Sequence, residues 1–386
     1  MPKHAARKPP KRWPFALLLV ALFAASAGGA FVLLRDQGDG DGGGSVDSQG
    51  AGVATTAGTT GTTLPTTTTA PAPDPVLGSG QPVTIAFAGD TNFEGSNATR
   101  LANDPASVLE PIAGVLSAAD LTVINLETAV GHGGTPAPKD FTFLAPPEAL
   151  EALRAGGVDV ASEANNHGLD FGPDVLEQSV QASVDHRFPV IGIGLDDEQA
   201  FAPYRTTING QRIAVIAATQ VLDGSLIDAW TATATHAGLA SAKRVDRLVE
   251  EVEAARADSD TVVVFLHWGI EQTTCPSGDQ ETLAQTLIDA GADVVVGSHA
   301  HRLLGGGMHG DAVVHYGLGN FAFAAHSPDG ARSGVFTVTI TGRHVDGYEW
   351  TPARIVDSQP VPLEGSEAAS ALDYWNSLRH CTDLTP

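Results

Sequence analysis

Cysteine is scarce in this sequence: Cys275 and Cys381 are the only two among 386 residues. Two thiols are too few for a structural zinc site of the usual kind, which takes four ligands. Outside the cytoplasm the pair could form one disulfide that ties the C-terminal tail to a loop after residue 270. We favour this disulfide, with two free thiols as the alternative.

Positive charge is also in short supply, with 21 Lys and Arg against 45 Asp and Glu and a net charge of -24. After residue 80 there are 15 basic and 40 acidic residues, so this part carries about −25. Such a surface repels polyanions at long range, and we expect no nucleic-acid partner. An anionic substrate stays compatible with it, because a bound dication can invert the local field.

Charged residues are absent from one run near the N-terminus, Phe15 to Leu34. Twenty helical residues span roughly 30 Å, the hydrocarbon thickness of a bilayer. Because basic residues lie mainly in 1–14, we expect a cytoplasmic N-terminus and an external C-terminal part. Ala25-Ser26-Ala27 resembles a signal-peptide cleavage site. The apolar run continues beyond it, which favours a single-pass membrane anchor at 15–34 over a cleaved signal peptide.

Apolar periodicity is missing from residues 35–80, which are rich in Gly, Thr and Pro. Such a segment buries too little surface to offset its ordering entropy, so we predict a disordered linker. Residues 81–386 form the predicted folded domain. The hydrophobic fraction of the chain, 42%, is ample for a buried core.

Strand-like and helix-like segments alternate in this domain, which predicts an α/β fold with parallel sheets covered by helices. The last third reads as β-rich only, and we expect it to form an additional sheet. The predicted strands are Val83–Ala88, Leu121–Leu126, Val158–Ser162, Val190–Ile193, Tyr204–Ile208, Arg212–Ala217, Val262–Leu266 and Asp293–Gly297. The predicted helices are Ala106–Ser117, Pro147–Ala155, Pro173–His186, Ser241–Arg256 and Asp279–Ala290, with Val245, Leu248, Val249 and Val252 on one face of the fourth.

Polar residues recur directly after the apolar strands, where open α/β sheets place their ligand sites. They include Asp90, Glu127, Asn166, His167 with Asp170, His267, and the pair His299 and His301. Hard oxygen and imidazole ligands suit Mn, Fe or Zn. Two such ions about 3.5–4 Å apart can activate a bridging water and neutralise an oxyanion. The pattern therefore predicts a site for one or two divalent metal ions.

Six motifs carry a resemblance over residues 83–325. They are Gly89-Asp90, Asn125-Leu126-Glu127, Asn165-Asn166-His167 with Asp170 and Gly172, His267-Trp268-Gly269 with Glu271, Gly297-Ser298-His299-Ala300-His301, and Gly317-Leu318-Gly319-Asn320-Phe321. In this order they resemble the CapA family of capsule and poly-γ-glutamate synthesis proteins, within the calcineurin-like metallophosphoesterase superfamily. The resemblance implies a four-layer α/β/β/α metallophosphoesterase-like sandwich.

The resemblance also implies roles for the site residues. Asp90 and His301 would bind one metal, Glu127 would bridge two, and Asn166, His267 and His299 would complete the second site. His167 would be the general acid, with Asp170 orienting it. The superfamily usually has Asp-x-His where this chain has Asp90-Thr91-Asn92, and Asp where it has Glu127. An amide is a weaker metal ligand than an imidazole.

Three further residues have structural interpretations that involve no metal ion. Asn320 is expected to form a turn that shapes the rim of the site. Trp268 is expected to pack in the core or to offer a platform for substrate. His132 lies among Gly131, Gly133 and Gly134 in a loop that could gate the pocket, although simple solvent exposure explains it better.

The expected function is that of a protein held in the bacterial cell membrane with its C-terminal domain outside the cytoplasm. The domain would take part in capsule or poly-γ-glutamate synthesis or export, through a metal-dependent hydrolase or transferase site. Its partner would be an anionic cell-surface polymer or the polymer's synthesis machinery. The alternatives are a non-catalytic polymer-binding or anchoring component and an extracytoplasmic phosphoesterase.

Overall fold

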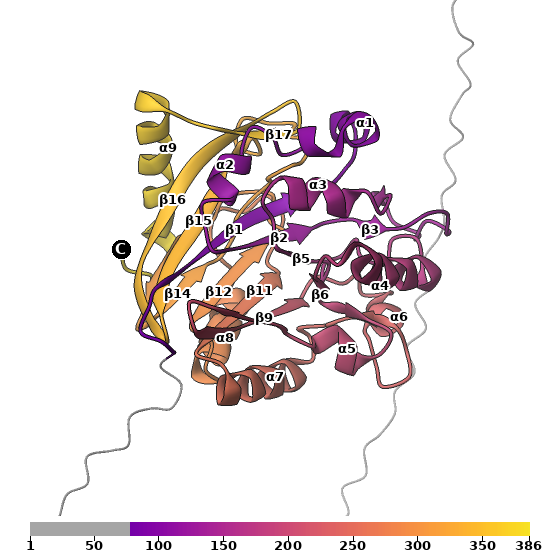
Figure 1. The fold of residues 1–386 in the computed structure, drawn as a ribbon, viewed down its shortest axis with the longest axis horizontal. Helices are drawn as coiled ribbons and strands as arrows, with labels where there is room; N and C mark the ends of the chain where they lie inside the picture. Colours follow the sequence, from indigo (N-terminus) through magenta and orange to yellow (C-terminus); the bar gives the residue numbers. More distant parts are fainter. Residues whose placement is uncertain (1–77) are drawn as a thin grey trace, which may run out of the picture. The chain divides into compact units, whose positions relative to one another are not determined.

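The computed structural model describes residues 78–386, which form a mixed α/β domain (Figure 1). The α/β character expected from the sequence is confirmed. Residues 1–14, the predicted anchor at 15–34 and nearly all of the predicted linker lie outside the described residues. Among helices in the described part, none has the length and apolar character needed to cross a bilayer.

The first large sheet has seven strands in the order β17-β16-β15-β1-β2-β5-β6. Their bounds are β1 Val83–Thr91, β2 Leu121–Leu126, β5 Val160–Ser162, β6 Val190–Ile191, β15 Arg332–Thr341, β16 His344–Val356 and β17 Gln359–Pro362. Strands β1, β2, β5 and β6 run parallel to one another, whereas β15, β16 and β17 add antiparallel strands beside β1. The carboxyl ends of the parallel strands therefore meet at one edge.

The second large sheet has six strands in the order β13-β14-β12-β11-β9-β8. Their bounds are β8 Tyr204–Ile208, β9 Gln211–Thr219, β11 Thr261–His267, β12 Val294–Ser298, β13 Gly306–His309 and β14 Ala312–His315. The four inner strands are parallel and the two edge strands antiparallel. Two small pairs complete the strands: β3 Ala129–Val130 with β4 Leu144–Ala145, and β7 Ile193–Gly194 with β10 Gly238–Leu239.

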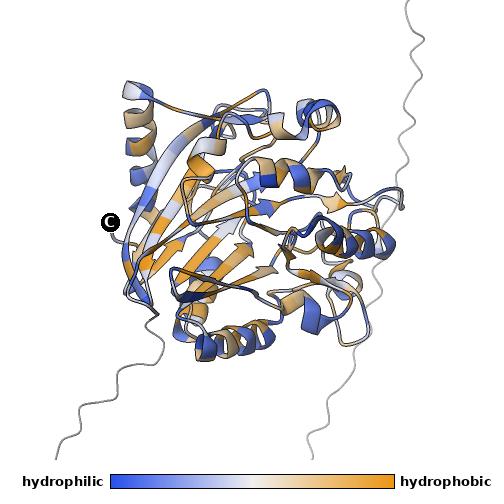
Figure 2. Cartoon of the chain, viewed as in Figure 1, coloured by the Kyte–Doolittle hydropathy of each residue, from blue (hydrophilic) through white to orange (hydrophobic). Residues whose placement is uncertain are grey.

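One hydrophobic cluster joins the facing sides of the two large sheets. Phe87 of β1 and Phe265 of β11 meet across it, with ring centroids 6.4 Å apart. Alternate residues of a strand point to opposite faces, so the remaining apolar residues of each sheet face outward. Figure 2 shows most of the strands in apolar colours, whereas the long β16 is pale.

Helices cover these outer faces, which gives the order helices, sheet, sheet, helices (Figure 1). Helices α1 Ser96–Asn103, α2 Ala113–Leu116, α3 Ala149–Ala155 and α4 Pro173–His186 contribute buried residues to the cluster outside the first sheet. Helices α5 Asp197–Phe201, α7 Val245–Asp258 and α8 Gly278–Asp289 do so outside the second. Helix α6 Ile227–Trp230 joins a smaller cluster, and α9 Gly365–Ser377 packs beside β16.

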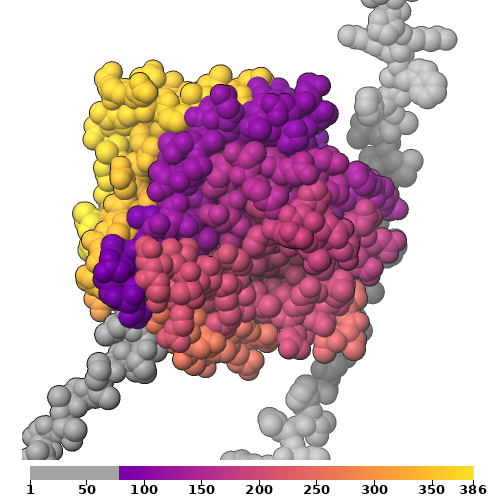
Figure 3. Space-filling model, in the orientation of Figure 1, coloured from indigo at the N-terminus to yellow at the C-terminus, as the bar shows by residue number. Residues whose placement is uncertain are grey.

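The prediction of an additional C-terminal sheet is wrong. The late strands extend the two existing sheets, β13 and β14 the second and β15 to β17 the first. The tail after residue 364 is also helical rather than β-rich, with α9 followed by the 3-10 turn Leu378–Cys381. Figure 3 shows the C-terminal part, in yellow, along one side of the domain.

Two predicted helices also differ. Ala106–Ser117 is broken into a 3-10 turn at Pro105–Ser107 and the short α2, because Pro111 lacks the N–H that a continuous helix needs. Helix α7 begins at Val245 instead of Ser241, since Ser241 pairs with Thr219 at the end of β9.

The apolar face of α7 is narrower than predicted. Leu248 and Val252 are buried, whereas Val245 is exposed at the start of the helix and Val249 is half-buried.

Cys275 and Cys381 form a disulfide with a Cα–Cα distance of 5.8 Å. The disulfide that we favoured is confirmed, and the alternative of two free thiols is wrong. It joins the loop before α8 to the 3-10 turn near the C-terminus. Although His380 lies close to both sulfurs, their bond to each other leaves no thiolate there for a metal ion.

Candidate metal centre

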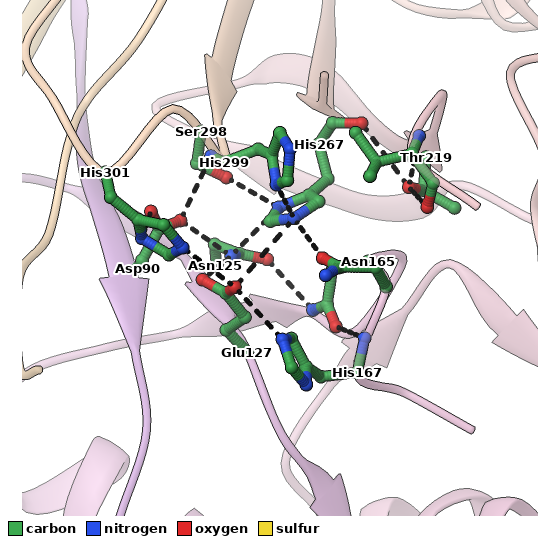
Figure 4. A network of polar contacts seen from close by, with 12 residues as sticks. Asp90, Asn125, Glu127, Asn165, His167, Thr219, His267, Ser298, His299 and His301 are labelled. Atoms are coloured by element: carbon green, nitrogen blue, oxygen red, sulfur yellow. Dashed lines mark hydrogen bonds and ion pairs between the residues drawn. The ribbon is translucent and has the colours of Figure 1, made fainter. Parts of the chain in front are cut away.

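The residues predicted from the strand ends meet between the two large sheets. Asp90 lies near the end of β1 and Glu127 directly follows β2, while His267 is the last residue of β11. Asn166 lies in the loop after β5, and His299 and His301 follow β12. Figure 4 shows the side chains of Asp90, Glu127 and the three histidines turned toward a common space. The structure therefore assembles all six predicted ligands from both sheets.

The two carboxylates of this centre are completely buried. Oδ1 of Asp90 accepts a hydrogen bond from the Asn125 amide at 2.9 Å. Oε1 of Glu127 is a buried atom without a hydrogen-bond partner, and Oδ2 of Asp90 has Nδ1 of His301 as its neighbour at 3.1 Å. Buried polar atoms are normally paired, and a buried carboxylate oxygen without a partner is costly. Both oxygens face imidazole nitrogens, and carboxylate oxygens with imidazole nitrogens are a donor set that suits a divalent cation.

The distances fit such a cation. Donor atoms of Asp90, Glu127 and His267 all lie within 4.8 Å of one another. Nε2 of His301 lies 3.7 Å from Oε1 of Glu127, and Nε2 of His267 lies 4.0 Å from the same oxygen. Glu127 is thus central, as expected for a bridging ligand.

The second predicted site is equally compact. Nε2 of His267 lies 2.6 Å from Oδ1 of Asn166 and 3.1 Å from Nδ1 of His299. His299 has a φ of 102° and His301 a φ of 52°, values that non-glycine residues rarely adopt. Backbone strain of this kind clusters where a structure holds functional side chains in place.

Burial and neighbouring charges shift the pKa values of the carboxylates and histidines of this centre in different directions. Burial would raise the pKa of Asp90, but the hydrogen bond and charge of His301 hold it below its usual value. Burial and the charge of Asp90 raise the pKa of Glu127 well above its usual value. Burial would lower the pKa of His301, but the charges of Glu127 and Asp90 raise it to about 10. Burial lowers the pKa of His267 strongly and, with the charge of His301, lowers that of His299 to about 4. Neutral imidazoles are the form that binds metal.

Asn92 stands at the position where the resemblance implies a histidine. Its side chain is buried, and its Oδ1 accepts a hydrogen bond from the backbone N–H of Glu94 at 3.3 Å. The amide is thus engaged in the local turn after β1. Of the expected first-site ligands, Asp90, Glu127 and His301 face the centre.

The predicted general acid borders the centre. Nδ1 of His167 lies 2.6 Å from Oδ2 of Asp170, and its Nε2 lies 3.7 Å from Oε1 of Glu127. The ring of Phe143 stacks on His167 with centroids 4.2 Å apart. Burial lowers the pKa of His167, although Asp170 opposes this effect. A carboxylate on Nδ1 fixes the tautomer and leaves Nε2 directed at the centre.

Sequence reasoning gave no role to Lys139, no individual role to Asn125, and only a turn at the rim of the site to Asn320. Lys139 contacts Asp170, and Asn320 contacts His301. Asn125 links Asp90 to His267, with 3.2 Å between its Nδ2 and the His267 Nδ1. Asn125 had a usable signal, because residues i and i+2 of a strand share a face and it is two residues before Glu127.

The structure also decides between the two interpretations given for Trp268 and for His132. Trp268 is fully buried and donates its indole N–H to the carbonyl of Tyr316 at 2.9 Å, so the packing interpretation is confirmed. His132 is exposed to solvent, as the simpler interpretation of its loop proposed.

A surface pocket of about 580 Å³ opens beside His167 and Asn166. Its other walls include Lys139, Glu271 and Phe141, the last of which is 71% exposed. A pocket that reaches the predicted general acid is the natural entry for a substrate.

Residues 84–325 match the family described as bacterial capsule synthesis protein PGA_cap. The chain belongs to this family. It is 31% identical over 253 residues to the capsule biosynthesis protein CapA of Bacillus anthracis, covering 64% of this chain and 59% of that protein. It is 26% identical over 262 residues to the PGA biosynthesis protein CapA of Bacillus subtilis, covering 67% of each.

Solved structures with a related course of the chain include a hypothetical protein from Thermus thermophilus. Its TM-score is 0.45 at 17% identity, and the match covers 71% of this chain and 100% of that one. A phosphatase from Mycoplasma pneumoniae has a TM-score of 0.44 at 14% identity, with coverages of 71% and 94%.

Proposed function

We propose that this PGA_cap domain is a metal-dependent hydrolase or transferase that acts on an anionic cell-surface polymer of the capsule or poly-γ-glutamate class. One observation carries the proposal. Oε1 of Glu127, a buried oxygen without a hydrogen-bond partner, faces the imidazoles of His167, His267 and His301, and the buried Oδ2 of Asp90 lies 3.1 Å from Nδ1 of His301. A structural core has no need of this arrangement, whereas one or two divalent cations would satisfy every member of it.

The residues available for chemistry divide into ligands and an acid. Asp90, Glu127 and His301 would hold one cation, and Glu127 with Asn166, His267 and His299 a second. Bound divalent cations would supply Lewis acidity and lower the pKa of a water molecule. His167 faces the same space through Nε2, while Asp170 holds its Nδ1–H. His167 is therefore placed to give a proton to a leaving group.

The names of the relatives suggest the bond. In a poly-γ-glutamate chain it would be the amide between successive residues. Hydrolysis adds the oxygen of water to the carbonyl carbon and breaks the C–N bond. Nε2 of His167, whose Nδ1 keeps its proton toward Asp170, takes the proton lost by water and passes it to the departing nitrogen. In a transfer reaction an amine replaces the water.

The location proposed for this chemistry is the outer face of a bacterial membrane. The uncharged run at 15–34, with its preceding basic residues, would anchor the chain, and residues 35–80 would hold the domain away from the bilayer. The disulfide between Cys275 and Cys381 supports an oxidising compartment.

A non-catalytic polymer-binding or anchoring role is the second candidate. It is favoured by Asn92, which replaces an expected imidazole ligand and is engaged with Glu94. A first site with fewer ligands would hold its cation less tightly, and a cation could still bridge the protein to a polyanion.

Metal analysis of the purified full-length chain tests the centre. We expect wild type and His344→Ala, a variant of an exposed histidine, to retain divalent metal. We expect His299→Ala and His301→Ala to lose most of it. Equally low metal in all four proteins would refute the centre.

Turnover then separates the roles. A γ-glutamyl polymer and a model phosphodiester are offered to the metal-loaded protein. Cleavage or transfer of the polymer supports the proposal, and cleavage of the phosphodiester alone would assign a phosphoesterase instead. Full metal occupancy with neither reaction would assign the binding role.

A further inference from the structure

A single lysine enters the candidate site from a loop. The loop between β3 and β4 is mostly exposed, but the Lys139 side chain is only 12% exposed. Lysine is rare in this chain, and Lys139 and Lys243 are the two within residues 78–386. A buried ammonium is costly to desolvate, so its position calls for a compensating partner.

Lys139 has two such partners. Its Nζ lies 2.6 Å from Oδ1 of Asp170, and it also donates to the backbone carbonyl of Asn166. The ring of Trp230 lies 5.2 Å from the ammonium, a favourable cation–π distance. One cation thereby joins the carboxylate that orients the predicted acid to the backbone of a predicted metal ligand.

The geometry beyond Lys139 depends on these contacts. Asp170 is completely buried, and its Oδ2 faces Nδ1 of His167 at 2.6 Å and accepts from the backbone N–H of Phe143 at 2.7 Å. Without Lys139, the buried carboxylate of Asp170 would keep the hydrogen bonds of Oδ2 but lose the positive charge that faces Oδ1. Its rotation or hydration would release the His167 ring.

The loop between β3 and β4 also binds through its backbone to the segment that contains Asp170. The N–H of Ala137 donates to the carbonyl of Asp170 at 2.7 Å, and that of Thr135 donates to Phe171 at 3.3 Å. Phe143 packs on the face of the His167 ring. The loop therefore contacts His167 on the face of its ring, through Phe143, and at Nδ1, which lies 3.3 Å from Nζ of Lys139.

We propose that Lys139 is a positioning residue that aligns His167, through Asp170, and Asn166, through its backbone, with the candidate metal centre. It acts through these groups and not on the reacting atoms. The inference rests on the proposed function insofar as His167 is the acid, but the alignment itself is a property of the protein without metal or substrate.

The first test observes the alignment directly. Nitrogen-15 NMR of the metal-free, full-length protein at pH 7 reports the proton on Nδ1 of His167, assigned with His167→Gln. We expect a slowly exchanging, downfield Nδ1 proton in wild type and in Lys243→Met, the matched control. We expect this signal to be lost or shifted in Lys139→Met and partly restored in Lys139→Arg. An unchanged signal in Lys139→Met would overturn the proposal.

The second test uses kinetics, if the polymer or phosphodiester is turned over. Loss of a group that orients a catalytic residue typically costs about 10- to 100-fold. We expect kcat to fall by this amount in Lys139→Met while KM changes little. A rise in KM alone would instead make Lys139 a substrate-binding residue and overturn the proposal.

The proposed function and the proposed role of Lys139 can fail independently of each other. If the protein turns over neither substrate, the proposed function fails, and the NMR signal still decides the role of Lys139. If Lys139→Met does not fold, by circular dichroism, Lys139→Gln takes its place because its amide can still donate to Asn166 but carries no charge. An unchanged His167 signal in that variant would count against the proposal in the same way.

Discussion

Asn320 fixes the tautomer of His301. The amide nitrogen of Asn320 donates to the carbonyl of Gly330 at 3.0 Å, and its Oδ1 lies 2.8 Å from Nδ1 of His301. A carbonyl oxygen only accepts, so the amide orientation is determined and Nδ1 of His301 must carry the proton. Nε2 is left facing Glu127. Fixing the ring of a metal-ligating histidine in this way is the usual task of its outer hydrogen bond.

Asn320→Ala should therefore weaken metal binding. We expect a loss of affinity of about 10- to 100-fold, because His301 would lose the nearer of the two oxygens that face its Nδ1, the other being Oδ2 of Asp90 at 3.1 Å. Titration of the metal-free protein with Mn²⁺ or Zn²⁺ measures it. Asn376→Ala removes an exposed asparagine of α9 and should bind as wild type does. Equal affinity in Asn320→Ala and Asn376→Ala would show that Asn320 only forms a turn.

The strand ends were predictable because their signal is local. An apolar strand followed by Asp90, or one ending at His267, is visible in a few residues. The rule that ligands gather at the carboxyl ends of parallel strands supplies the rest. The contacts of Asn320 and Lys139 are not local. Each depends on a loop whose course is set by tertiary packing, and neither residue lies in a periodic pattern.

The misplaced C-terminal strands have a related cause. A strand pattern predicts extended backbone and a buried face, but it does not say which sheet the strand joins. β15 pairs antiparallel with β1, about 250 residues earlier in the sequence. Such pairing is fixed by shape and burial across the whole domain, so the sequence could indicate strands but not their sheet.

Reduction of the disulfide should destabilise the domain. The bond joins residues 106 positions apart, and closing a loop of this size restricts the unfolded chain. We expect Cys275→Ser with Cys381→Ser to lower the free energy of unfolding by about 2–4 kcal/mol. Denaturant titration measures it. In dithiothreitol, wild type should have the same free energy of unfolding as the double variant. The reductant should not change the stability of the double variant itself, and a change there would point to another target of the reductant.

His315 should make the domain less stable in acid. It is fully buried, accepts the indole N–H of Trp375 at 3.0 Å and stacks on Trp350. Burial and the charge of Arg379 lower its pKa to about 3. An unfolded histidine has a pKa near ~6.5, so the unfolded chain binds more protons below that pH. Stability should fall as the pH drops from 6.5 toward 3, by about 2 kcal/mol at pH 5 from this residue.

His315→Asn isolates this effect. Its carbonyl oxygen can still accept the indole N–H of Trp375, but it does not titrate. We expect a lower stability at pH 7 from the smaller side chain, together with a flatter dependence on pH between 5 and 6.5. Denaturant titrations at several pH values measure both. Parallel curves for wild type and His315→Asn would show that another group causes the acid sensitivity.

Glu163 should have the opposite pH dependence. It is fully buried, and burial raises its pKa well above the usual value despite the hydrogen bond to Ser179. Oγ of Ser179 lies 2.9 Å from Oε1 of Glu163 and 2.8 Å from the carbonyl oxygen of Val130. The same Oγ accepts a hydrogen bond from the backbone N–H of Val130. A hydroxyl has one proton, so Ser179 can serve both oxygens only if Glu163 is protonated and donates to it.

Glu163→Gln keeps that donor without the titration. With a raised folded pKa, the folded state of wild type binds more protons than the unfolded chain above pH ~4.5, so its stability falls as the pH rises. We expect equal stability of wild type and Glu163→Gln near pH 4 and an advantage for Glu163→Gln that grows toward pH 7. Ser179→Ala should cost about 1–3 kcal/mol at both pH values, because it leaves Glu163 and Val130 without their partner. A Glu163→Gln variant that loses stability as the pH rises, in parallel with wild type, would mean that Glu163 is ionised in the fold.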